Sequence, residues 1–140
     1  MKQIVPVSKI MTSNVIKLSL TDDLTKAERL FKKHHIRHIP VVNGNKIIGM
    51  LSYTDLLRIS FADVVDDDTE IRDTTVYNMF SVEQVMAKKL VIISPETTIK
   101  EAAEILSKNE FHALPVCVGD LLVGIVTTTD LIKYLIVQYK

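Results

Sequence analysis

Two near copies of one eight-residue stretch, GMLSYTDL at residues 49–56 and GIVTTTDL at residues 124–131, reveal how this chain is organised. Their starting positions differ by 124 − 49 = 75 residues, and the same offset aligns the surrounding sequence without a gap from residue 7 to residue 60. Identical pairs at this offset include Val7 and Val82, Met11 and Met86, Ala27 and Ala102, and Pro40-Val41 and Pro115-Val116. An ungapped match of this length predicts an internal repeat, with copies at residues 7–60 and 82–137.

Both copies have the same predicted layout of strand, helix, strand, strand, helix. The first strand is expected at residues 15–19 and 90–94, and an amphipathic helix follows, which in the second copy begins with a Thr98–Glu101 capping box. The next two strands form a hairpin through an NGN or GD turn, and the last helix begins at the Thr-Asp corner. A repeat of about 55 residues buries little surface alone. We therefore expect an α/β (α+β) fold in which two pseudo-symmetric repeats pack around a shared core.

The segment between the copies, residues 61–81, has no repeat partner and is rich in carboxylates. One alternative for it is a calcium-binding loop. Such a loop needs a glycine at its sixth position, where this segment has Ile71. We therefore interpret it as a solvated acidic linker.

Composition excludes several classes of function. Lys and Arg total 17, as do Asp and Glu, so no net charge draws the chain toward nucleic acid or an acidic membrane. No apolar run approaches the roughly 18 residues of a membrane helix, and the N-terminal residues do not form a secretion signal. The single cysteine, Cys117, lies in an apolar stretch typical of a buried strand. These features predict a soluble, cytoplasmic protein.

The repeated corners offer chemistry for a phosphorylated sugar. Ser52 and Thr127 are placed where a strand ends and a helix begins, and the free N–H groups of a helix N-terminus attract phosphate. Asp55 and Asp130, three residues later, can each accept two hydrogen bonds from a ribose diol. The same Ser/Thr-x-x-Asp spacing also fits a helix cap with no ligand. The two interpretations are compatible, since a cap can become the ligand site.

Basic residues distinguish the two copies. The segment before Ile39 carries Lys32, Lys33, His34, His35, Arg37 and His38, whereas the second copy has only Lys108 and His112 there. We therefore expect the first corner to contact phosphate more, although cations also suit a helix C-terminus without a ligand. The histidines raise the alternative of a metal site, which is disfavoured because Pro40 ends the helix by about Ile36.

The doubled motif, with Pro-Val before the hairpin and G-h-x-[S/T]-x-x-D after it, resembles a tandem pair of cystathionine-β-synthase (CBS) domains. The resemblance implies a regulatory module that binds an adenine nucleotide (AMP, ADP or ATP), or S-adenosylmethionine, NAD or a cyclic dinucleotide, in clefts between the repeats. Asp55 and Asp130 would then hold the ribose, and Ser52 and Thr127 would face the phosphate. It further implies polar contacts before the hairpin and backbone contacts to the base, from Arg37, His38, His112, Asn14, Val15, Ile16, Leu90 and Val91.

Neither copy contains a recognisable catalytic set, so we expect a non-enzymatic protein that signals to a separate effector protein. Apolar residues follow both corners and predict a homodimer through the helix ends, namely Leu56, Leu57, Ile59 and Phe61 in the first copy and Leu131, Ile132, Leu135, Ile136 and Val137 in the second. The alternative function is a structural homodimerisation module with vestigial ligand corners.

Overall fold

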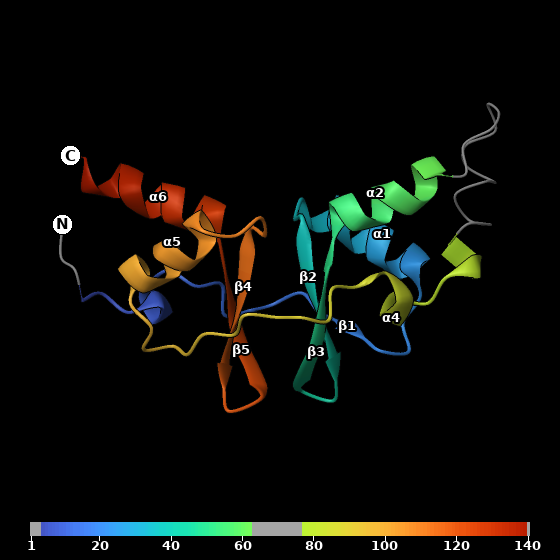
Figure 1. Ribbon diagram of the computed structural model, residues 1–140, viewed down its shortest axis with the longest axis horizontal. Helices are drawn as coiled ribbons and strands as arrows, with labels where there is room; N and C mark the ends of the chain where they lie inside the picture. Colours follow the sequence, from blue (N-terminus) through green and yellow to red (C-terminus); the bar gives the residue numbers. More distant parts are fainter. Residues whose placement is uncertain (1–3, 63–76, 140) are drawn as a thin grey trace. The chain divides into compact units, whose positions relative to one another are not determined.

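The computed structural model describes residues 4–62 and 77–139, and it divides the chain into two compact units (Figure 1). The first unit, Ile16–Lys89, contains the corner at Ser52. The second unit combines Met1–Val15 with Leu90–Lys140 and contains the corner at Thr127. Most of the predicted acidic linker, including the disfavoured calcium loop, lies outside the described residues.

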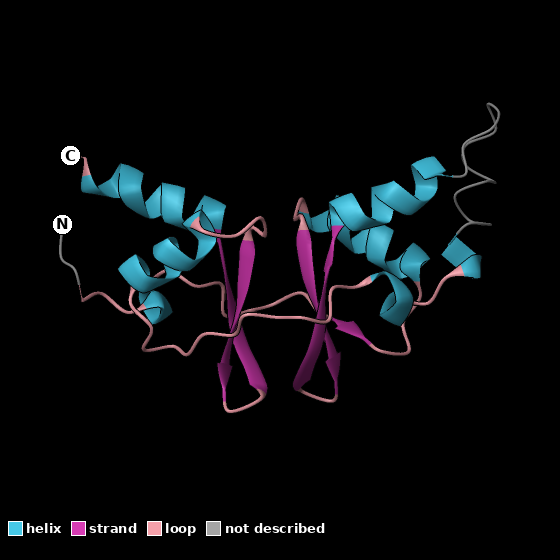
Figure 2. Cartoon of the chain, viewed as in Figure 1, coloured by secondary structure: helices cyan, strands magenta, loops and turns pink. Residues whose placement is uncertain are grey.

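The first unit is a strand hairpin covered by helices (Figure 2). Strand β2 pairs antiparallel with β3 and parallel with β1, while α1 packs against both α2 and β2. The Asn-Gly-Asn turn predicted between β2 and β3 is present, with Gly44 at a φ of 66° that favours glycine. Its described elements are β1 (Leu18–Ser19), α1 (Leu24–His34), β2 (His38–Asn43), β3 (Lys46–Ser52), α2 (Tyr53–Ala62) and α4 (Val82–Val85).

The second unit repeats this plan. Strands β4 and β5 form an antiparallel hairpin, α5 packs against β4 and α6, and α6 also packs against β5. Helix α5 begins with the capping box predicted from the sequence: the N–H of Glu101 donates to the Thr98 hydroxyl, and the N–H of Thr98 donates to the Glu101 carboxylate. Its described elements are η1 (Val7–Lys9), α5 (Ile99–Ser107), β4 (Ala113–Val118), β5 (Leu121–Thr127) and α6 (Thr128–Gln138).

The first strand of each repeat is shorter than predicted. Residues 15–19 form only the two-residue β1, and residues 90–94 form a single parallel bridge between Ile93 and Val116. A parallel ladder extended toward the N-terminus would need an N–H from Pro40 or Pro115, which proline lacks. The motif proline therefore stops the ladder at the same register in both repeats.

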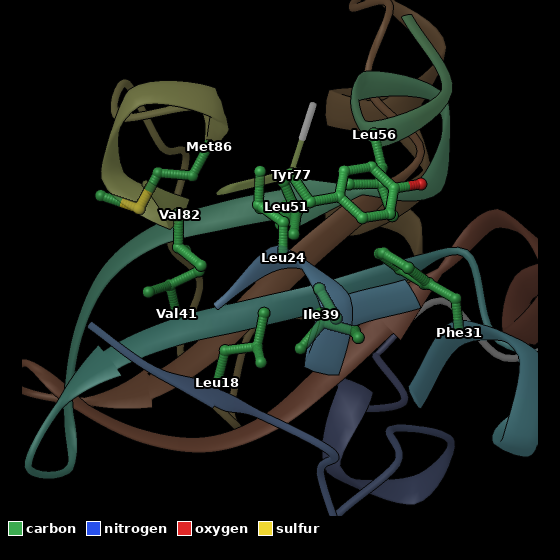
Figure 3. Close-up of a cluster of buried hydrophobic side chains, with 11 residues drawn as sticks. Leu18, Leu24, Phe31, Ile39, Val41, Leu51, Leu56, Tyr77, Val82 and Met86 are labelled. Carbon is green, nitrogen blue, oxygen red and sulfur yellow. The ribbon is translucent and has the colours of Figure 1, made fainter. Parts of the chain in front are cut away.

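Each unit buries a hydrophobic cluster of its own, and Figure 3 shows that of the first unit. In the first unit it includes Leu18, Leu24, Ile39 and Leu51, all without solvent exposure. Every residue of the second cluster corresponds, at the 75-residue offset, to a residue of the first. The predicted mixed α/β fold with two repeats is therefore confirmed by matching elements and matching cores.

The leading segment of each repeat packs in the unit built by the other repeat. Val7 is fully buried in the second unit, where its N–H donates to the Thr97 carbonyl oxygen at 2.7 Å. Val82 is fully buried in the first unit, and Ala87 exchanges two backbone hydrogen bonds with Met50. The compact units therefore differ from the sequence repeats by an exchange of these segments.

Candidate functional site

The first corner joins β3 to α2 and is closed by reciprocal hydrogen bonds. The backbone N–H of Asp55 donates to the Ser52 hydroxyl oxygen at 3.0 Å. In return, the backbone N–H of Ser52 donates to Asp55 Oδ2 at the longer distance of 3.4 Å. The other carboxylate oxygen, Oδ1, accepts a hydrogen bond from Arg58 Nη1 at 3.2 Å. The motif serine and aspartate thus cap helix α2.

The second corner has the same design between β5 and α6. The N–H of Asp130 donates to the Thr127 hydroxyl at 3.2 Å, and the N–H of Thr127 donates to Asp130 Oδ2 at 2.9 Å. Among the described residues, Asp130 has no partner other than Thr127, so Oδ1 remains an available acceptor. Both corners are half-buried, which leaves the capping groups within reach of a ligand.

Residues just before each hairpin are held beside these corners. The carbonyl of Arg37 accepts a hydrogen bond from the N–H of Tyr53 at 2.9 Å, and the carbonyl of His112 accepts one from Thr128 at 3.0 Å. His38 lies directly opposite Ser52 in the β2–β3 register. The side chains of Arg37 and His112 are exposed and that of His38 is half-buried. The first corner therefore has two basic residues nearby.

The candidate base-contacting residues leave their backbone uncommitted. Within the described chain, no backbone–backbone hydrogen bond involves Asn14, Val15, Ile16, Leu90 or Val91. Because the motif prolines stop the ladders there, these peptide groups remain available to a ligand. Ile16 belongs to the first unit, whereas the other four residues belong to the second.

The glycine of each motif accommodates a methionine. A Cβ atom on Gly49 would lie 2.3 Å from the sulfur of Met86, and one on Gly124 would lie 2.7 Å from the sulfur of Met11. The space beside each glycine is therefore filled by a methionine side chain from an exchanged segment. Each glycine meets the methionine of the other copy, so the spacing within one copy did not indicate this packing.

The other residues considered for chemistry are Cys117 and the histidines at the end of α1. Cys117 is buried in β4, and burial raises the pKa of its thiol, with a further contribution from the negative charge of Asp120. Helix α1 ends at His34 and is followed by His35 in the left-handed conformation, in agreement with the predicted helix end. Within residues 4–62 and 77–139, no group of three His, Cys, Asp or Glu residues could hold a metal ion.

The apolar residues predicted to form an interface after each corner are mostly exposed in the second copy but not in the first. Leu56 is fully buried, Leu57 and Ile59 are half-buried, and Phe61 has no described side-chain environment. In α6, however, Ile132, Leu135, Ile136 and Val137 are exposed, and Leu131 is half-buried. None of the described helices is both long and apolar enough to cross a membrane.

The chain is a tandem-repeat protein, because both units carry the same capped Ser/Thr-x-x-Asp corner between a strand and a helix. Comparison with known families identifies the family. The CBS domain model matches residues 7–62 and 82–137, which is most of the chain. The protein therefore belongs to the CBS domain family.

Curated relatives differ in length. An uncharacterized protein of Methanocaldococcus jannaschii is 32% identical over 133 residues, covering 92% of this chain but only 31% of that protein. The CBS domain-containing protein YhcV of Bacillus subtilis is 29% identical over 125 residues, covering 89% of this chain and 81% of YhcV. The chain thus spans about a third of the first relative and most of the second.

Solved structures share the fold at lower identity. The structure of CBSX2 in complex with AMP matches with a TM-score of 0.79 and 21% identity, covering 97% of this chain and 99% of that one. The CBS domain pair of protein MJ0100, in complex with 5′-methylthioadenosine and S-adenosyl-L-methionine, matches with a TM-score of 0.79 and 23% identity, covering 98% and 99%. Both are CBS structures that span nearly the whole of this chain.

Proposed function

We propose that this protein is a regulatory module that binds an adenosyl ligand at the Ser52–Asp55 and Thr127–Asp130 corners. The observation that carries the proposal is the duplicated corner, in which a carboxylate and a hydroxyl meet at the N-terminus of a helix. The carboxylate suits a ribose diol, and the helix N-terminus suits phosphate. AMP, 5′-methylthioadenosine and S-adenosylmethionine in similar structures support this class of ligand.

The surroundings of the corners supply further contacts. Arg37 and His38 add basic groups beside the first corner, and His112 lies beside the second. The uncommitted peptide groups of residues 14–16 and 90–91 are suited to hydrogen-bond the adenine base. We infer that binding here alters the surface offered to an effector protein, and that the protein regulates rather than catalyses.

The test is a thermal-shift screen followed by calorimetry. A ligand present at 100 times its Kd stabilises the folded state by about 2.7 kcal/mol. The ligands are AMP, ADP, ATP, NAD, S-adenosylmethionine, 5′-methylthioadenosine and a cyclic dinucleotide. At least one should stabilise the protein, and Asp55→Ala or Asp130→Ala should remove that stabilisation at its own corner.

Glu101→Ala provides a matched control. Glu101 occupies the same capping-box position in α5 as the motif aspartate does in α6, but it lies outside the repeated corner. It should lower stability through loss of a cap while leaving ligand affinity unchanged. The proposal fails if no ligand stabilises the protein, or if all three substitutions affect binding equally.

A homodimerisation module with vestigial corners is the second candidate, favoured by the exposed apolar residues of α6. Ile132 and Ile136 are 57% and 64% exposed, and with Leu135 and Val137 they form an exposed apolar group of the kind that marks an interaction site. This function predicts a dimer whose stability does not change with nucleotide. Sedimentation with and without the best ligand separates the candidates, and Ile132→Lys with Ile136→Lys should yield monomers if α6 forms the interface.

A further inference from the structure

The two corners differ in what contacts the motif aspartate. In the first, Asp55 Oδ1 accepts a hydrogen bond from Arg58 Nη1 at 3.2 Å, one helical turn along α2. The equivalent position in the second repeat, 58 + 75 = 133, is Lys133. Among the described residues, Lys133 forms no ion pair with Asp130. One corner therefore has an occupied carboxylate oxygen and the other has an available one.

The lengths of the capping hydrogen bonds also differ between the two corners. The N–H of Thr127 lies 2.9 Å from Asp130 Oδ2, whereas the N–H of Ser52 lies 3.4 Å from Asp55 Oδ2. A carboxylate shared between a cap and a guanidinium is expected to bind each less closely. The Arg58 side chain is 72% exposed and that of Asp55 is 25% exposed. A pair this exposed is weak, so another anion can replace Asp55 as the partner of Arg58.

We propose that Arg58 makes the first corner selective for phosphorylated adenosyl ligands. This inference rests on the proposed function. A ribose hydroxyl that binds Asp55 Oδ1 competes with Arg58 for the same atom, so it weakens the contact between the carboxylate and the guanidinium. A ligand that carries phosphate at the N-terminus of α2 gives Arg58 a new partner that matches its planar fork. An uncharged nucleoside weakens this contact without offering Arg58 a new partner.

The second corner lacks this dependence on phosphate. Asp130 Oδ1 is available to a ribose hydroxyl, and among the described residues no cation competes for it. Adenosyl compounds without phosphate therefore face no equivalent cost there. Arg58 acts as a specificity-determining residue of the first corner, because it favours ligands by their phosphate rather than by their base.

The experiment measures AMP and adenosine binding at the first corner by calorimetry. Asp130→Asn confines the measurement to that corner, because the asparagine carbonyl can still accept the Thr127 N–H while the charge that favours the ribose is lost. In this background, Arg58→Ala should weaken AMP about tenfold and should not weaken adenosine, so the ratio of the two affinities falls about tenfold. Lys133→Ala, the matched control at the equivalent position, should leave the ratio unchanged.

The possible outcomes separate this inference from the proposed function. If wild-type protein binds an adenosyl ligand but Arg58→Ala changes both affinities by the same factor, the inference is overturned and the function stands. Loss of all binding in Asp130→Asn alone would overturn it too, because the first corner would then bind nothing. If wild-type protein binds neither compound nor any other adenosyl ligand, the proposed function fails and the inference fails with it.

Discussion

Replacing Gly49 by alanine tests the packing that holds the first unit and its exchanged segment together. The new Cβ would lie 2.3 Å from the sulfur, 2.8 Å from Cγ and 2.9 Å from Cε of Met86. Non-bonded heavy atoms prefer about 3.5–4.0 Å, so the methionine must move by more than about 1 Å. Because Met86 is only 7% exposed, it has little room to move within the core. We expect Gly49→Ala to lower the free energy of unfolding by about 2 kcal/mol.

A double-mutant cycle in urea gives the decisive comparison. Met86→Ala alone should cost about 2–5 kcal/mol, but in the double variant the Gly49→Ala methyl enters the vacated space. The double variant should therefore lose about 1–2 kcal/mol less than the sum of the single variants. Gly44→Ala is the control: its site is open and its φ is 66°, so it should cost about 1 kcal/mol and show no coupling to Met86. Additive losses for Gly49→Ala and Met86→Ala would refute the packing argument.

Three further changes probe the units separately. His35→Gly should stabilise the first unit by about 0.5–1 kcal/mol, because His35 ends α1 with a left-handed φ of 53°; unchanged or lower stability in urea would contradict this. Tyr77→Phe should cost about 1–3 kcal/mol by removing the 2.6 Å hydrogen bond from the buried Tyr77 hydroxyl to Glu28, whereas an equal loss in Tyr77→Phe measured on a Glu28→Ala background, which has no acceptor, would argue against that bond. Backbone and side-chain hydrogen bonds from Thr98 lower the pKa of Glu101, so the carboxylate stabilises the fold above its ordinary pKa of 4.5 and loses this contribution as the pH falls through its lowered pKa. Glu101→Gln keeps an acceptor that does not titrate, so its stability should fall less than wild type below pH 4.5; parallel pH curves would contradict the assignment.

The hairpins and helix starts were predictable because local chemistry determines them. The predicted hairpins through the NGN and GD turns match the β2–β3 and β4–β5 pairs, because a glycine turn between two apolar segments specifies each hairpin. The Thr98–Glu101 cap was also predictable from its spacing. By contrast, the length of the first strands was overestimated. The β propensity of residues 15–19 does not show that their partner in the ladder is Pro40, which lacks the N–H needed to extend it.

The helix cap at each corner was predictable from its residues, but the further contacts of the corner were not. The sequence places Ser52 and Asp55 at one corner, yet it does not show that Arg58 shares the carboxylate. The exchange of leading segments was also hidden, because the repeat reads identically whichever unit Met11 joins. Contacts between residues far apart in the chain depend on tertiary packing, and the 75-residue offset alone does not specify them.

Amide NMR during a ligand titration tests the central claim most directly. Addition of AMP or 5′-methylthioadenosine to the ligand-free protein should produce saturable shifts at the backbone amides of Ser52, Asp55, Thr127 or Asp130. The same titration should shift the uncommitted amides of residues 14–16 or 90–91. Saturable shifts confined to other parts of the chain, or none with any adenosyl ligand at millimolar concentration, would contradict the claim that these corners bind such a ligand.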